Sequence, residues 1–255
     1  QFFSAPTSLI ASFGPPEGDQ QTFQVRVEPG EPQLSKLARV DAIMGAVAQG
    51  EITPAEGVRR IEEVAEAPSP YGSVATTLSF ALASAAASRF FGGGLREVAA
   101  SFAIGLGIGL LALVAARVRG VGRVFDPLAS ILAAFLATAL AVHFGPVSVY
   151  IAMLSGLIVL VPGFPLMTAM TELATRNLVS GTARLAGALG TFLAIGFGVA
   201  LGPRIAEILF GAPLVARPVP LAPWTEGAAL LLAPLAFTVL LRAEPRETPW
   251  IVFAG

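Results

Sequence analysis

One apolar segment of the chain ends in the run Leu160-Val161-Pro162-Gly163-Phe164-Pro165, which prevents a continuous α-helix. Each proline removes a backbone amide donor, and its ring clashes with the preceding helical turn. Lipid cannot satisfy the carbonyl groups that such a break frees, so protein or trapped water must cover it. Transporters often build substrate sites at broken helices of this kind. We therefore predict a broken helix at residues 160–166, with Pro162, Gly163 and Pro165 as its hinge.

The composition supports a chain that is embedded in a membrane. Hydrophobic residues make up 55% of the sequence and charged residues only 13%, whereas a soluble domain carries about 25% charged residues. The net charge of −1 argues against binding to nucleic acid. The absence of cysteine excludes disulfides and thiolate metal sites, and the single histidine, His143, argues against a histidine-based metal site. We expect no metal and no cofactor.

Apolar segments along the chain approach the roughly 20 residues that a helix needs to cross a bilayer. They lie at residues 73–91, 98–116, 127–144, 147–161, 185–201 and 225–241, and another begins near Trp250. The predicted fold class is predominantly α, a polytopic helical membrane protein. We expect a membrane domain of about five helices at residues 73–222, and the start of a second group of membrane helices at 223–255.

Residues 1–72 are mostly water-soluble in character and predict a small α/β module with a proline-rich linker. Its alternating and helical patterns predict strands at 5–13 and 22–27, joined by a turn at 14–20, and helices at 35–49 and 53–67. The second helix begins with a capping box, in which Thr53 caps the helix and Glu56 reaches back. Because the chain begins with Gln1 and ends inside an apolar stretch, we expect it to be part of a longer protein.

Loop arginines predict the orientation of the chain, since cytoplasmic loops carry an excess of basic residues. With residues 1–72 in the cytoplasm, the inner loops hold more arginines than the outer loops. The inner set is Arg117, Arg119, Arg123, Arg176, Arg184, Arg242 and Arg246, and the outer set is Arg89, Arg96, Arg204 and Arg217. We therefore expect a multi-pass protein with a cytoplasmic N-terminal module. A short interfacial helix is expected at Pro203–Phe210.

Polar residues gather directly after the break. Pro165 suits the first position of a short helix, whose free amides would favour an anion such as a carboxylate. Thr168, Glu172 and Arg176 recur at a spacing of four residues, so they would share one helical face. Arg184 would open the next apolar segment. The residues expected to bind a substrate or to couple to an ion are Thr168, Thr171, Glu172, Arg176, Ser180 and Arg184.

Simpler interpretations of these residues stay open. The segment after the break could be a solvated cytoplasmic helix with a Glu172–Arg176 surface pair, which would contribute about 0.3–0.5 kcal/mol. Arg184 could be a basic anchor whose side chain reaches to the membrane surface. His143 could be an interfacial residue and not a proton relay. No nucleophile–base pair or phosphate-binding loop stands out in the sequence, so we expect no enzyme.

Several segments resemble the threonine/serine exporter (ThrE) family. They are Phe3–Ile10, Val25–Val27, Leu34–Tyr71, Phe90–Gly93, Val161–Leu166, Glu172-Leu173 and Ser180–Leu185. The stretch from Pro162-Gly163 to Arg184 is the most specific, and the resemblance covers essentially the whole chain. Residues from about Pro223 to Gly255 resemble the start of the second half of the fused family members. One departure is Glu172-Leu173, where the family usually has Asp-Leu, so a carboxylate is kept with a longer reach.

The resemblance implies a proton-driven antiporter that exports threonine and serine across the bacterial inner membrane. Under this interpretation, the helix start after Pro165 holds the substrate carboxylate, and Thr168 or Thr171 contacts the hydroxyl or ammonium group. Glu172 receives the ammonium or couples to a proton, and Arg176 or Arg184 tunes its charge. The expected partners are threonine, serine, protons and the lipid bilayer. Whether copies of the chain form a homo-oligomer stays open.

Two other functions also stay open. Related two-gene versions of the family imply export of a dicarboxylate such as succinate, with Arg176 and Arg184 binding the second carboxylate. A function from another class is a membrane receptor or scaffold, in which residues 1–72 would sense a signal and the membrane part would be an anchor. The broken helix argues against this last function, because an anchor does not need one.

Overall fold

The computed structural model describes residues 2–5, 8–15, 19, 21–26, 33–214 and 216–254. The chain divides into two compact units. One comprises Gln1–Glu31 and Val161–Gly196, and the other comprises Pro32–Leu160 and Phe197–Gly255. The described residues are mainly helical, with a small sheet near the N-terminus, which confirms the predicted fold class. The predicted domain limits at residues 72 and 222 stay a prediction.

The first unit contains a three-stranded antiparallel sheet in the order β1-β2-β3. Its strands are β1 (Phe2–Ala5), β2 (Ser8–Phe13) and β3 (Gln21–Arg26). The expected strand at 22–27 is confirmed as β3. The strand expected at 5–13 as its partner is confirmed as β2, which begins at Ser8 and pairs with β3, whereas β1 was not predicted. Much of the expected turn at 14–20 lies outside the described residues.

The same unit holds α8 (Gly163–Ala174) and the first part of α9 (Leu178–Phe210). The break at residues 160–166 is confirmed, but α8 begins at Gly163 and not at Pro165. The first amides of a helix have no intrahelical acceptor, so Pro165 in the first turn costs no hydrogen bond. The Leu166 amide then donates to the Pro162 carbonyl at 3.0 Å. Pro162 therefore stands at the break itself, immediately before α8.

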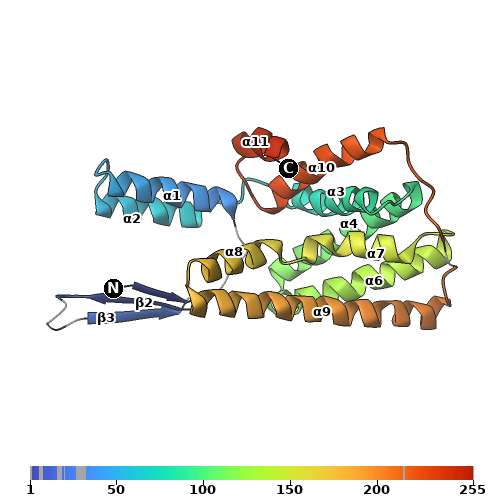
Figure 1. Cartoon of the computed structure of the whole chain (residues 1–255), viewed down its shortest axis with the longest axis horizontal. Helices are drawn as coiled ribbons and strands as arrows, with labels where there is room; N and C mark the ends of the chain where they lie inside the picture. The colour runs from blue at the N-terminus through green and yellow to red at the C-terminus, as the bar shows by residue number, and fades with distance from the viewer. Residues whose placement is uncertain are drawn as a thin grey trace. The chain divides into compact units, whose positions relative to one another are not determined.

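Four apolar helices of the second unit pack against one another. They are α3 (Ser73–Phe90), α4 (Leu95–Arg117), α6 (Phe125–His143) and α7 (Val149–Leu157). Helix α4 contacts the other three, and α7 also contacts α3 and α6 (Figure 1). Their buried side chains are mostly alanine and serine. Small residues let the backbones of membrane helices approach closely, which is the basis of this packing.

Further elements of the second unit are α5 (Arg119–Arg123), the 3₁₀ turns η1 (Ile158–Leu160) and η2 (Pro245–Glu247), α10 (Trp224–Leu240) and α11 (Thr248–Ala254). Helix α10 packs against α3. Among the described helices, α4, α6 and α9 are long and apolar enough to cross a membrane. Together α7 and α8 would make a fourth crossing if they form one broken span. The chain is thus a membrane protein with helical spans.

Helix α9 differs most from the sequence prediction. It runs for 33 residues, or roughly 50 Å at 1.5 Å per residue, without a separate helix at Pro203–Phe210. The expected interfacial helix is therefore wrong, because Pro203 lies inside α9. Proline is tolerated within membrane helices where neighbouring groups satisfy the freed carbonyl. Since α9 begins at Leu178, Ser180 and Arg184 belong to its first turns and not to a loop.

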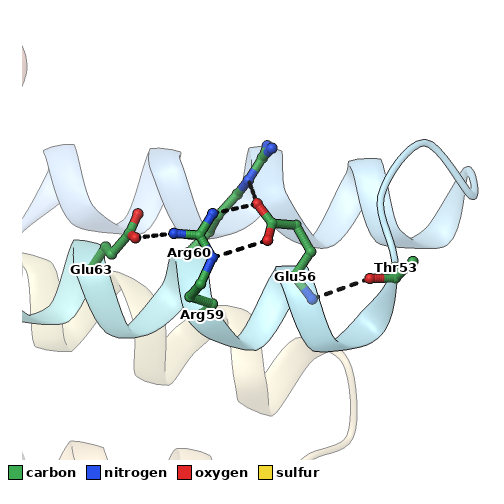
Figure 2. Close-up of polar contacts among 5 residues, drawn as sticks. All are labelled: Thr53, Glu56, Arg59, Arg60 and Glu63. Atoms are coloured by element: carbon green, nitrogen blue, oxygen red, sulfur yellow. Dashed lines mark hydrogen bonds and ion pairs between the residues drawn. The ribbon is translucent and has the colours of Figure 1, made fainter.

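Helices α1 (Leu34–Ala48) and α2 (Pro54–Glu66) form the expected helical hairpin of the second unit. The Thr53 hydroxyl accepts the Glu56 amide at 3.3 Å, which confirms Thr53 as the cap. Figure 2 shows that the Glu56 carboxylate turns instead toward Arg59 and Arg60, which donate to it at 2.6 and 2.8 Å. Only half of the predicted capping box is therefore formed, because two guanidinium groups compete for the carboxylate.

Glu56 makes the stability of this hairpin depend on pH. Hydrogen bonds from Arg59 and then from Arg60 lower the pKa of Glu56 from 4.5 to about 2. Because the folded-state pKa is the lower one, this stabilisation is complete above pH 4.5 and disappears as the pH falls toward 2. Hydrogen-exchange protection of the α2 amides should fall over that range in the native chain, and less so in Glu56→Gln. Equal pH dependence in both chains would contradict this expectation.

The start of α1 is fixed to the end of α10 in the second unit. The Leu34 amide donates to the Leu241 carbonyl at 3.0 Å, so an unpaired donor of one helix meets an unpaired acceptor of the other. Beside this contact, Arg39 Nε donates to Glu244 Oε1 at 2.7 Å and lowers the pKa of the Glu244 carboxyl. The helical hairpin is thereby tied to the segment at residues 241–247.

Candidate functional site

The candidate site lies in the first unit, where α8 ends and α9 begins. Arg184 Nε donates to Glu172 Oε1 at 2.9 Å, which makes an ion pair between the two helices. The second carboxylate oxygen, Glu172 Oε2, is buried and has no hydrogen-bond partner among the described residues. An unpaired buried carboxylate oxygen is costly, and it is the acceptor that a ligand N–H group would seek.

The chain reversal between α8 and α9 explains why these two side chains meet. Arg176 adopts a positive φ of 64°, and the Asn177 amide donates to the Glu172 carbonyl at 2.8 Å. A residue in the left-handed region commonly ends a helix in this way. Beyond the turn, Gly181 lies against Leu173: an added Cβ would be 2.7 Å from Leu173 Cγ. The close approach at Gly181 brings Arg184, one turn further along, to Glu172.

The expected polar face along residues 168–176 is only partly formed. Thr168 and Thr171 lie on α8, and each hydroxyl donates at 3.0 Å to the carbonyl four residues earlier. Their oxygens still have lone pairs to accept a hydrogen bond. Arg176 lies beyond the end of α8 at Ala174, so it does not continue this face, and Glu172 pairs with Arg184 instead. The alternative of a Glu172–Arg176 surface pair is therefore wrong.

The other predicted residues lie close by in the chain. Ser180 is buried in the first turn of α9. Pro162 and Gly163 mark the break, and Pro165 lies in the first turn of α8. The structure thus brings Glu172 and Arg184 into contact and leaves Arg176 on the exposed turn. Among the described residues, no group of three or more histidine, cysteine, aspartate or glutamate side chains could hold a metal ion.

A second buried carboxylate, Glu97, was not predicted. It lies in the first turn of α4 in the second unit and is 2% exposed. Glu97 Oε2 accepts the Gly94 amide and Oε1 accepts the Ser148 amide, each at 2.9 Å. The sequence prediction starts this span at Val98, which leaves Glu97 in a loop. The signal that could have found it is a glutamate three residues after Gly94, the position from which a side chain caps a helix.

Comparisons with known proteins agree with the resemblance in the sequence. Residues 1–206 match the family described as "Putative threonine/serine exporter". Among curated proteins, the chain is similar to several yeast proteins named "Pheromone-regulated membrane protein 10". The protein from Debaryomyces hansenii is 30% identical over 212 residues, which covers 80% of this chain and 21% of the relative.

Two further relatives extend this comparison. The Zygosaccharomyces rouxii protein is 30% identical over 246 residues, covering 94% of this chain and 24% of the relative. The Saccharomyces cerevisiae protein is 26% identical over 265 residues, which cover 99% of this chain and 34% of the relative. The chain therefore spans about a fifth to a third of the length of these relatives.

No solved structure matches the chain. The family match covers most of the sequence and includes both the break at Pro162 and the pair formed by Glu172 and Arg184. The chain therefore belongs to the threonine/serine exporter (ThrE) family.

Proposed function

We propose that the chain is part of a secondary transporter that exports small hydroxy amino acids, threonine and serine, in exchange for protons. The observation that carries this proposal is the Glu172–Arg184 pair, which leaves one carboxylate oxygen buried and unpaired just after a broken membrane helix. Broken helices are common substrate sites in transporters. The family description agrees with an amino acid as cargo.

The two members of this pair suit the two charged ends of an amino acid. Glu172 Oε2 would accept the substrate ammonium, since it has no other donor among the described residues. Arg184 uses Nε for Glu172, so its two terminal nitrogens could bind the substrate carboxylate. Thr168 and Thr171 would accept a hydrogen bond from the substrate hydroxyl. Such a site would favour a zwitterion with a short hydroxyl side chain.

The break supplies the proposed movement. Pro162 prevents continuous hydrogen bonding at the junction before α8, and Gly163 adds backbone freedom. We propose that the N-terminal module lies in the cytoplasm, because the arginine distribution favours that orientation. The bacterial inner membrane is the location that the family resemblance implies for the spans. An exporter would then collect its cargo from the side on which residues 172–184 lie.

The ion pair also bears on the alternatives. A dicarboxylate has no ammonium group for Glu172 to receive, and the negative charge of Glu172 beside Arg184 would repel its second carboxylate. The pair therefore favours a zwitterionic substrate over succinate. A receptor or scaffold would carry no substrate at all.

Efflux of labelled threonine from preloaded cells tests the function. Cells that express the chain should release threonine faster than cells without it, and excess internal serine should slow this release. Inhibition by succinate but not by serine would identify a dicarboxylate exporter instead. Release equal to that of control cells would contradict transport and favour a scaffold.

Pro162→Ala tests the hinge in the same assay. Restoring an amide donor at the break should favour a continuous helix, so efflux should fall several-fold at equal expression. Pro213→Ala is the matched control, because Pro213 lies in the segment between α9 and α10. Equal efflux in the Pro162→Ala variant and the native chain would rule out the hinge.

A further inference from the structure

The interface between α3 and α4 contains a group of buried polar side chains that the proposed substrate site does not use. Ser84, Ser88 and Ser101 are fully buried, and none of their hydroxyls has a hydrogen-bond partner among the described residues. Thr77 Oγ1 is also buried without a hydrogen-bond partner among the described residues. Serine in a membrane helix usually donates to a carbonyl one turn earlier, as Ser155 does in α7 at 2.6 Å. These hydroxyls therefore remain free to bind something else.

Glu97 lies at one end of this group. An added Cβ on Gly93 would lie 2.5 Å from Ser88 Oγ and 3.0 Å from Glu97 Cβ, so both side chains lie beside Gly93. Ser101 follows Glu97 by one turn on the same face of α4. Gly105 follows after another turn, where an added Cβ would lie 2.6 Å from Ser84 Oγ. A row of side-chain oxygens thus runs from the Glu97 carboxylate along the interface between α3 and α4.

The chemistry of this row favours a small cation. A carboxylate and several hydroxyls offer only oxygen ligands, and an ionisable group inside a membrane segment marks an ion or proton pathway by default. Each Glu97 oxygen accepts one amide hydrogen bond, which leaves a lone pair on each for a further ligand. The glycines opposite the serines leave no space for an organic molecule, because the backbones of α3 and α4 are in close contact.

We propose that Glu97, with the hydroxyls of Ser88 and Ser101, binds a monovalent cation, either H⁺ or Na⁺, between α3 and α4. Binding to the carboxylate would weaken its hold on the Ser148 amide, which precedes the first turn of α7. Helix α7 leads along the chain to the break at Pro162. The site would therefore link cation binding to the position of α7. Cation binding is independent of the substrate, but the use of this cation to drive export rests on the proposed function.

Other charged or titratable groups lie on the elements around Glu97. Arg96 is its neighbour on α4, and Arg89 on α3 is engaged by Glu226 at 2.9 Å. The ring of His143 at the end of α6 packs against Phe210. The remaining groups are Tyr150 on α7 and Arg217 in the segment before α10. The acid among them, Glu226, is exposed and paired with Arg89, so Glu97 is the buried carboxylate at this end of α3, α4 and α7 among the described residues.

The binding test uses the full chain, purified in lipid nanodiscs. Infrared difference spectra on acidification should contain the carbonyl band of a buried carboxylic acid if the cation is a proton. Thermal unfolding should shift upward in sodium chloride relative to choline chloride if it is sodium. One of these responses is expected in the native chain and in the Glu226→Gln control, and it should be lost in Glu97→Gln. The proposal is wrong if the native chain shows neither response, or if Glu97→Gln retains the response of the native chain.

A second variant keeps the test decisive if Glu97→Gln does not fold. Ser88→Ala with Ser101→Ala removes two hydroxyls that have no partner, so it should fold normally. It should shift the carboxylic acid band or remove the stabilisation by sodium. An unchanged response would exclude the hydroxyls as ligands and contradict the site.

The driving role has its own measurement, in vesicles that contain the same chains. Glu97→Gln should retain exchange of labelled for unlabelled threonine but lose the acceleration caused by an imposed pH or sodium gradient. Retained acceleration would contradict coupling at Glu97. If no chain carries threonine, the proposed substrate is wrong, while the binding test above still decides the cation site.

Discussion

Glu172→Gln should reduce threonine efflux about ten-fold or more at equal expression, since a hydrogen bond to a charged group contributes about 1.5–3 kcal/mol and 1.4 kcal/mol is a factor of ten. The substitution removes the negative charge that would hold the substrate ammonium. It also leaves Arg184 without its ion-pair partner. Both effects weaken the site, whereas an amide of the same length preserves the shape of the side chain. Initial rates of labelled threonine release provide the measurement.

Two matched variants control this prediction. Glu172→Asp keeps the charge with a shorter reach, so it should retain much of the efflux. Glu207→Gln removes a carboxylate of α9 that pairs with Arg204 at 3.2 Å, and it should leave efflux unchanged. Efflux at the native rate in Glu172→Gln would show that this carboxylate does not hold the substrate.

Gly105→Ala should lower the thermal stability of the chain, although alanine favours helix by about 1 kcal/mol over glycine. The added methyl group would lie 2.5 Å from the Phe80 carbonyl oxygen and 2.8 Å from Ala81 Cα. The backbone of α3 cannot move aside as a flexible side chain can, and overpacking of this kind costs about 1–3 kcal/mol. Thermal unfolding in detergent at matched conditions would measure the effect.

Gly187→Ala is the control for this substitution. An added Cβ at Gly187 in α9 would have no atom within 4 Å, so only the gain in helix propensity remains. This variant should be as stable as the native chain or slightly more stable. If Gly105→Ala is also as stable as the native chain, the close packing of α3 on α4 is wrong.

Most of the apolar helices could be predicted because apolar length is a strong and local signal. The segments expected at 73–91, 98–116, 127–144 and 225–241 agree with the helices α3, α4, α6 and α10 within a few residues at each end. Of these four, α4 and α6 are long and apolar enough to cross a membrane. The limits of α9 could not be predicted in this way. Ser180 and Arg184 are polar, so the sequence predicts a loop there, and Pro203 predicts the end of a helix. Continuation through both depends on tertiary packing, such as Gly202 against Ala134 of α6.

The candidate site was predictable in its residues but not in its pairing. The spacing of four residues joins Glu172 to Arg176 only if the helix continues, and the positive φ of Arg176 ends it. The partner of Glu172 is Arg184, which a chain reversal brings close, and no helical periodicity contains that information. Glu97 was missed because the predicted span began at Val98, and because its second amide partner, Ser148, lies 51 residues further along the sequence.

The central claim is that this chain carries a zwitterionic amino acid through a site at Glu172 and Arg184, and threonine counterflow in reconstituted vesicles tests it most directly. Vesicles loaded with unlabelled threonine should accumulate external labelled threonine. Excess serine should abolish this uptake, and vesicles with Glu172→Gln should lack it. Uptake by the native chain no greater than in vesicles without protein, or equal uptake by Glu172→Gln, would contradict the account.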